Sequence, residues 1–224
     1  MSFSKKWEAQ FADSNHLSIW PWSDVVSYVM RYCRPVTGDF KVLEIGCGAG
    51  ANIPFFLSLG VDYTGVDGSE SAIKLVRDNY PEISDKLHVM DFTKSLPYEE
   101  FDLVLDRASV THNSTENIEN FIRLLTPRLK NNGVFIGIDW FSDLYSDYAN
   151  NIGEIGDDKY TMFFDSKSRR FSNLGNVHFS SKEHIYDLFS AFKIEHMQLK
   201  QISDLTSDNV EWNFASWNFI ATLK

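Results

Sequence analysis

VLEIGCGAGANIPFF, residues 42–56, is the stretch of this sequence that decides the fold. It consists of an apolar run that contains Glu44, glycines at positions 46, 48 and 50, and then residues typical of a helix. Glycines in such a place allow the backbone to turn sharply and a ligand to approach main-chain N–H groups, with a helix N-terminus directly behind. The stretch therefore predicts a strand, a loop and a helix that together hold a nucleotide.

Strands and helices alternate along the chain outward from this unit. We expect strands at 40–46, 62–67, 86–92, 101–107 and 133–140, and helices at 51–60, 69–80, about 115–130 and 180–192. Strands separated by crossover helices form a parallel sheet that is covered on both faces. Residues 193–202 and 211–224 look like two further strands with no helix between them, so they should pair antiparallel.

Two segments do not follow this alternation. Residues 1–37 combine short helical patterns with Trp20 and Trp22, and we expect them to form a helical lid. An alternative is that the tryptophans only fix the N-terminal helix to the sheet. Residues 142–179 are polar and interrupted, apart from the YTMFF patch at 160–164, and we interpret them as an insert near the substrate site. Residues 1–224 then form a single domain, as the length allows.

The composition limits the classes of partner. Aromatic residues make up 15% of the chain, which fits a Phe-rich core or the walls of an enclosed small-molecule pocket. The net charge is −10 and the concentrated basic cluster is confined to residues 167–170, so we do not expect a nucleic-acid partner. Cys33 and Cys47 form no ligand-spaced motif, which predicts no metal site and a reducing, cytoplasmic location. We expect no membrane partner, and a monomer or homodimer.

Acidic residues mark the carboxyl ends of the expected strands, which is where ligands bind in open α/β sheets. Asp67 ends the second strand 21 positions after Gly46, about the spacing at which a carboxylate reaches ribose hydroxyls. The next three strands end in Asp91-Phe92, in Asp106-Arg107-Ala108 and in Asp139-Trp140. Each of these signals is weak alone, and their order along the chain is the stronger signal.

With these motifs in place, residues 38–140 resemble the class I S-adenosylmethionine-dependent methyltransferases. VLEIGCGAG is similar to the first motif of that family, ExGxGxG, and FDLVLDRASVTH at 101–112 is similar to its fourth. The helix-free C-terminal pair of strands fits the family's sheet. The resemblance implies an α/β fold with a Rossmann-like, seven-stranded, mostly parallel sheet, helices on both faces and a C-terminal antiparallel hairpin.

The resemblance also implies S-adenosyl-L-methionine as the cofactor. In this family the glycines approach the methionine part, the residue at the position of Asp67 holds the ribose hydroxyls, and the pair at Asp91-Phe92 recognises the adenine. The full set of cofactor-binding residues that it implies is Glu44, Gly46, Cys47, Gly48, Gly50, Asn52, Asp67, Gly68, Ser69, Asp91, Phe92, Asp106, Arg107 and Ala108.

Methyl transfer is an in-line displacement, so positioning and exclusion of water supply much of the catalysis and no general base is guaranteed. His112 follows the fourth strand on the expected substrate side and is the first candidate for a base, and Asp139 is the second. Trp20, Trp22 and Trp140 are candidates for the lid or for the substrate walls. The acidic chain favours a small-molecule acceptor.

Three alternatives stay open at this point. The acceptor could be a protein side chain, or the chain could bind the cofactor without turnover. Gly46, Gly48 and Ala51 also fit the GxGxx(G/A) pattern of dinucleotide sites, which would suit an NAD-dependent oxidoreductase. Against that alternative, the sequence lacks a catalytic Tyr-x-x-x-Lys motif.

Overall fold

The described part of the chain comprises residues 5–12, 18–34, 37–156, 158–164, 170–172, 174–205 and 211–224 of a computed structural model. Its strands are β1 (Lys41–Ile45), β2 (Asp62–Asp67), β3 (Leu87–Val89), β4 (Phe101–Arg107), β5 (Leu129–Phe141), β6 (Glu154–Ile155), β7 (Thr161–Phe164), β8 (Gly175–His178), β9 (Phe192–Leu205) and β10 (Glu211–Leu223). Its α-helices are α1 (Lys5–Ala12), α2 (Ser23–Tyr32), α3 (Ile53–Ser58), α4 (Glu70–Asn79), α5 (Thr115–Leu125), α6 (Ser146–Ala149) and α7 (Lys182–Leu188).

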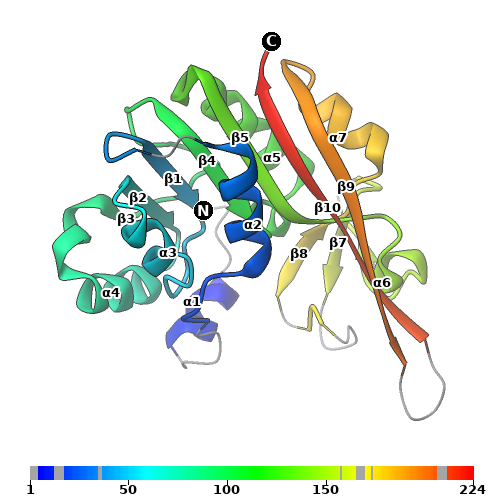
Figure 1. The fold of residues 1–224 in the computed structure, drawn as a ribbon. Helices are drawn as coiled ribbons and strands as arrows, with labels where there is room; N and C mark the ends of the chain where they lie inside the picture. Colours follow the sequence, from blue (N-terminus) through cyan, green and yellow to red (C-terminus); the bar gives the residue numbers. More distant parts are fainter. Residues whose placement is uncertain are drawn as a thin grey trace.

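Seven strands form one twisted sheet in the order β3-β2-β1-β4-β5-β10-β9 (Figure 1). The first five pair in parallel, whereas β10 runs antiparallel to both β5 and β9. This confirms the predicted Rossmann-like sheet with a C-terminal antiparallel hairpin. The strand order reverses between β1 and β4, so the carboxyl ends of these two strands mark the crevice at which an open α/β sheet binds ligands.

The local sequence explains where the helices begin and end. The Ser69 hydroxyl accepts a hydrogen bond from the Ala72 N–H and caps α4, and Ser114 caps α5 in the same way through the Asn117 N–H. The helix expected at about 115–130 ends earlier, at Leu125, because Pro127 has no N–H group to continue the helical hydrogen bonds; a short 3-10 turn at Thr126–Arg128 then leads into β5 at Leu129. The strand expected at 86–92 is likewise shorter, with only Leu87–Val89 paired.

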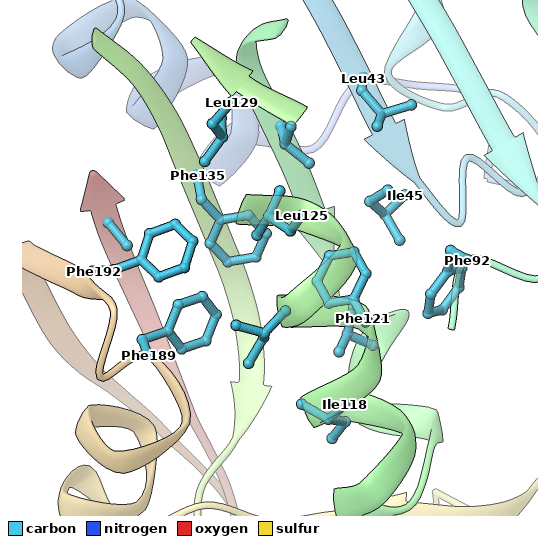
Figure 2. Close-up of a cluster of buried hydrophobic side chains, with 14 of the residues drawn as sticks. Leu43, Ile45, Phe92, Ile118, Phe121, Leu125, Leu129, Phe135, Phe189 and Phe192 are labelled. Atoms are coloured by element: carbon cyan, nitrogen blue, oxygen red, sulfur yellow. The ribbon is translucent and has the colours of Figure 1, made fainter. Parts of the chain in front are cut away.

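Helices cover both faces of the sheet. One buried cluster joins α2, α3 and α4 to the sheet, and another joins α5 and α7 to the opposite face. Figure 2 shows the second cluster, in which Phe121 of α5 and Phe189 after α7 approach Phe135 of β5. The Phe135 ring centroid lies 6.1 Å from that of Phe121 and 5.2 Å from that of Phe189. Each such buried side chain contributes about 1.5–3 kcal/mol of burial free energy, so this packing fixes where the strand ends lie.

The insert carries its own sheet and its own core. Strands β6, β7 and β8 form a three-stranded antiparallel sheet beside the lower end of the β9–β10 hairpin (Figure 1). An aromatic cluster packs between this sheet, the end of β5 and β10, and it comprises Phe141, Tyr145, Met162, Phe164, Phe171, Val177, Phe179, Trp212 and Ala215. Part of the high aromatic content therefore lies in a third core next to the strand ends.

No helix in the described ranges is long and apolar enough to cross a membrane.

Candidate functional site

A cavity of about 310 Å³ opens at the carboxyl ends of β1, β2, β4 and β5, a volume within the range of small-molecule sites. It lies at the reversal of the strand order, as expected for an open α/β sheet. The predicted site residues that line it are Trp22, Glu44, Gly46, Cys47, Gly48, Asn52, Asp67, Gly68, Asp91, Phe92, Arg107, Ala108, His112 and Asp139. Gly50, Ser69, Asp106, Trp20 and Trp140 do not line it.

The glycine loop after β1 is shaped by backbone conformations that favour glycine. Gly46 has φ +65° and Gly48 has φ +52°, both in the left-handed region. A Cβ atom on Gly46 would stand 2.1 Å from the Ser109 Oγ atom, so the loop after β1 and the loop after β4 meet with no room for a side chain. Gly50 lies behind the loop, where a Cβ would meet Val76 at 2.9 Å, so its contribution is to pack the loop on α4.

Glu44 is buried at the end of β1 and connects the loop to its surroundings. Its carboxylate accepts hydrogen bonds from Asn52 Nδ2 at 2.7 Å and from the Tyr63 hydroxyl at 2.6 Å. The Asn52 Oδ1 atom accepts a hydrogen bond from the backbone N–H of Trp22 at 3.1 Å. Burial raises the pKa of Glu44 to about 7, against the lowering effect of these two hydrogen bonds. The carboxylate is therefore held in place at the floor of the cavity.

Asp67 at the end of β2 organises the same loop. Its carboxylate accepts hydrogen bonds from the Gly48 N–H at 2.9 Å and from the Ser69 N–H at 2.8 Å. Burial raises the pKa of Asp67 to about 6, and the backbone N–H groups oppose that rise. Ser69 itself points away from the cavity, because its hydroxyl caps α4 and donates to Glu8 of α1.

Asp91 and Phe92 form the far end of the cavity. The Asp91 carboxylate accepts hydrogen bonds from the Thr93 N–H and hydroxyl, and it lies 3.1 Å from the Lys94 ammonium. The Phe92 ring packs edge-on against Phe121 at 5.7 Å between centroids, so it belongs to the core while it still borders the cavity. A carboxylate beside an aromatic ring suits an amino group on a flat base.

Asp106 has a different place from its neighbours on β4. It is fully buried, and its Oδ1 accepts hydrogen bonds from the N–H groups of Ser109 and Val110 at 3.0 and 3.1 Å. Burial raises the pKa of Asp106 to about 7. The expectation of direct cofactor contact does not fit this position, because the carboxylate faces the loop that it holds. Arg107 and Ala108 line the cavity in its place.

Asp139 at the end of β5 lies in a network of donors. Its carboxylate accepts hydrogen bonds from Arg107 Nη2 at 3.0 Å, from the Lys200 ammonium at 3.2 Å and from the Ser216 hydroxyl at 2.9 Å. The Lys200 ammonium also bonds Asp24 of α2 at 2.6 Å. This arrangement fixes the Asp139 side chain between β4, β9 and β10, so the second candidate for a base already has three donors around it.

The expected substrate wall at Trp140 is wrong. Asp139 has φ +54°, and the pairing of β10 with β5 shifts between Trp217 and Phe219, which breaks the alternation of side chains along β5. Trp140 is fully buried and packs against Phe219 with ring centroids 5.2 Å apart. The following residue, Phe141, lines the cavity instead.

The two N-terminal tryptophans also differ from each other. Trp20 has 76% of its surface exposed and makes no wall of the cavity, so the lid expectation does not fit it. Trp22 lines the cavity, and the Arg107 guanidinium lies 3.7 Å from the centroid of its ring. The backbone N–H of Trp22 also donates to the Asn52 side chain. Trp22 therefore connects the start of α2 both to Asn52 and to Arg107.

Helix α1 lies within residues 1–37, which we expect to form a lid, but its residues Trp7 and Phe11 are not among the site residues predicted from the sequence. Trp7 and Phe11 line the cavity, and Phe11 packs on Ala49 and on Ala72 of α4. Glu8 anchors the helix, since its carboxylate accepts hydrogen bonds from the hydroxyls of Ser69 at 2.6 Å and Ser71 at 2.5 Å. In the sequence, Trp7 and Phe11 lie about one helical turn apart, with Glu8 between them. This spacing places the two aromatic side chains on one face of a helix and is a signal for a helix that covers the site.

Three buried carboxyl groups predict an unusual dependence of stability on pH. Glu44, Asp67 and Asp106 have pKa values of about 7, 6 and 7 in the fold, above those of an unfolded chain. Because these three groups bind more protons in the folded state, they should raise the free energy of unfolding as pH falls from about 8 to about 6.5. Burial lowers the pKa values of His178 and His184, which oppose this rise and make it smaller. Thermal unfolding followed by circular dichroism, without cofactor, measures this effect. Glu44→Gln should flatten the dependence, and a melting temperature that falls over this range would contradict the assignment.

Comparison with known proteins agrees with this geometry. Residues 42–133 match the sequence model of a family described as a methyltransferase domain. A solved S-adenosylmethionine-dependent methyltransferase from Methanosarcina mazei is similar in fold, with a TM-score of 0.68, 16% identity, and coverage of 91% of this chain and 98% of that one. No curated protein matches the sequence.

Two further structures are similar over nearly the whole chain. An S-adenosylmethionine-dependent methyltransferase from Anabaena variabilis has a TM-score of 0.67 and 14% identity, and the match covers 98% of this chain and 93% of that one. Another from Clostridium acetobutylicum has a TM-score of 0.62 and 15% identity, with 98% and 91% covered. At such identities the structures show the fold alone, and the sequence model adds a match over residues 42–133. Residues 42–133 therefore match the model of the methyltransferase-domain family, and the chain has the class I S-adenosylmethionine-dependent methyltransferase fold.

Proposed function

We propose that this protein transfers a methyl group from S-adenosyl-L-methionine to a nitrogen, oxygen or sulfur atom of a small-molecule acceptor. The observation that carries the proposal is the continuity of one cavity, which runs from Asp91 and Phe92 past the glycine loop to Ala108 and Phe141. Donor and acceptor must meet in line within one enclosed space, and a continuous cavity meets that requirement.

The residues along the first half of the cavity fit the cofactor. A Cβ on Gly48 would stand 3.3 Å from the Phe11 ring, so the glycine loop and α1 lie close together and a side chain at this position would crowd the cavity that both of them line. Asp67 provides a carboxylate for ribose hydroxyls, and Asp91 with Phe92 provides a site for the adenine. When bound, the cofactor supplies a methyl group on a sulfonium centre that is already activated toward nucleophiles.

The chain's own part is to orient the acceptor and to exclude water. Trp7 and Phe11 of α1 cover the cavity next to the glycine loop, and Trp22 covers it next to Arg107. Glu8 holds α1 down through its hydrogen bonds to the hydroxyls at the start of α4. Exclusion of water strengthens the electrostatic interactions of the fixed carboxylates and prevents hydrolysis.

A small acceptor is favoured over a protein side chain because large apolar side chains line the cavity. Phe171 and Leu174 of the insert and Trp22 are among them. We also propose that the enzyme acts in the cytoplasm, since both cysteines are unpaired, and that it is a monomer or homodimer.

Incubation with methyl-labelled S-adenosylmethionine and a cell extract tests the proposal. We expect label in the small-molecule fraction, identified by mass, and far less label with the Gly46→Ala variant at a cofactor concentration that does not saturate it. Label in the protein fraction would instead assign a side-chain acceptor. Tight cofactor binding with no labelled product in either fraction would make the protein a non-catalytic binding module.

With the acceptor identified, His112→Gln tests the need for a general base. The His112 ring packs edge-on against Trp7 at 4.9 Å and Phe141 at 5.8 Å between centroids, so it has a place in the wall of the cavity. We expect kcat to fall less than about tenfold, because positioning supplies most of the catalysis. A loss of about 100-fold or more, with the acidic limb of the pH profile removed, would assign His112 as the base.

A further inference from the structure

The acceptor end of the cavity is an aromatic chamber, formed by Phe141, Tyr145, Phe171, Leu174 and Phe214. The Phe171 ring lies edge-on to Phe141 with centroids 5.0 Å apart, and Tyr145 lies 5.0 Å from Phe171 and 5.5 Å from Phe214. Phe141 belongs to β5, Tyr145 directly precedes α6, Phe171 and Leu174 belong to the insert, and Phe214 belongs to β10. All five pack in or against the third core, which therefore positions them. Walls of this kind favour a planar apolar molecule, which stacks on ring faces and contacts ring edges.

Two hydrogen-bond donors lie at this chamber without a full set of partners in the described chain. Arg107 donates a hydrogen bond from Nη2 to Asp139, and its guanidinium lies over the Trp22 ring. The guanidinium donates no other hydrogen bond to a described residue. A guanidinium carries five N–H donors, so several remain for a ligand. Tyr145 is 1% exposed and borders the cavity, and its hydroxyl makes no hydrogen bond to a described residue.

The charged and polar groups at this end of the cavity favour an anionic ligand. Asp139 lines the cavity next to the chamber, and three donors already engage its carboxylate. Arg170 also borders the cavity, close to the Asp204 carboxylate at 2.9 Å. Burial and nearby carboxylates raise the pKa of Tyr145, so its hydroxyl stays protonated and donates. The chamber therefore presents donors and a cation to whatever enters it.

Resting on the proposed function, we infer that the acceptor is a planar, mainly apolar molecule with an anionic oxygen group such as a carboxylate, which Arg107 and Tyr145 bind. The aromatic walls hold the ring system, and the two donors fix its orientation relative to the glycine loop. A guanidinium suits this role because its planar donors match the geometry of a carboxylate. The carboxylate of the cofactor's methionine is a second source of the same chemistry, so the experiment separates the two.

Isothermal titration of the protein saturated with S-adenosylhomocysteine tests the inference. The probes are 1-naphthoate, the neutral 1-naphthamide and the cationic 1-naphthylmethylamine. We expect naphthoate to bind at least about tenfold more tightly than the amide, and the amine most weakly. Arg107→Gln should remove the preference for naphthoate. Tyr145→Phe should weaken naphthoate roughly threefold to tenfold, the scale of one hydrogen bond. Arg123→Gln, an exposed arginine on α5, is the matched control and should change nothing.

Equal binding of the three probes by the wild-type protein would overturn the inference. To separate the two sources of carboxylate, Arg107→Gln is also titrated with S-adenosylhomocysteine and with methylthioadenosine, which lacks the amino-acid part. We expect both affinities to change less than about threefold. Selective weakening of S-adenosylhomocysteine would assign Arg107 to the cofactor and would also overturn the inference. If the wild-type protein bound no S-adenosylhomocysteine, the proposed function itself would fail, which is a distinct result.

Discussion

Gly46→Ala is expected to weaken binding of S-adenosylhomocysteine by on the order of 100-fold. The added Cβ would stand 2.1 Å from Ser109 Oγ and 2.4 Å from Ser109 Cβ, so the loop after β1 or the loop after β4 must move by about an ångström or more. Misplacement on this scale costs on the order of 100-fold where a ligand must be held in a defined geometry, which corresponds to about 2.7 kcal/mol. Calorimetric titration of the folded variant measures the loss.

Gly60→Ala is the matched control for this substitution. Gly60 has φ +69°, so an alanine there has a similar backbone strain of about 1–2 kcal/mol, but a Cβ at Gly60 meets no atom within 4 Å. It lies after α3, outside the cavity. Both variants should melt at a lower temperature, and only Gly46→Ala should lose affinity. Equal affinities in the two variants would contradict the role given to the glycine loop.

Asp67→Ala is expected to lower the affinity for the cofactor by about 1–3 kcal/mol, or roughly 5- to 150-fold. The substitution removes the carboxylate proposed to hold the ribose hydroxyls. It also leaves the N–H groups of Gly48 and Ser69 without their acceptor, so the loop loses its internal support. Titration with S-adenosylhomocysteine and with adenosine measures the effect, and both ligands should weaken because both carry the ribose.

Asp62→Ala, at the opposite end of β2, is the control for this variant. Asp62 is half-buried and pairs with Lys86 at 3.2 Å, away from the cavity. We expect its affinity for both ligands to equal that of the wild-type protein. If Asp67→Ala folded and bound as tightly as Asp62→Ala, Asp67 would have no part in the cofactor site.

The parts of the fold that depend on local patterns could be predicted from the sequence. The apolar runs that end in Glu44-Ile45-Gly46, Asp67 and Arg107 became β1, β2 and β4, because buried parallel strands require such runs. The missing helix between residues 202 and 211 predicted the antiparallel pair β9 and β10 correctly. In a parallel sheet the carboxyl ends of the strands share one edge, so the acidic strand ends converge on the cavity.

The parts that depend on tertiary contacts could not be predicted. Trp140 turned into the core because Asp139 adopts a left-handed conformation, and nothing in the local sequence distinguishes that from a regular strand end. Asp106 faces its own loop because Ser109 and Val110 offer their N–H groups, which a spacing rule does not reveal. The insert looked irregular since its strands are two to four residues long, too short for a periodic signal.

The central claim is that the cavity binds a methyl donor of the S-adenosyl class. Calorimetric titration of the wild-type protein with S-adenosylhomocysteine and, separately, with NADH tests it most directly. The account predicts saturable binding of S-adenosylhomocysteine that Gly46→Ala weakens by on the order of 100-fold, and no measurable binding of NADH. Binding of NADH together with no binding of S-adenosylhomocysteine would contradict the account and would assign the glycine loop to a dinucleotide.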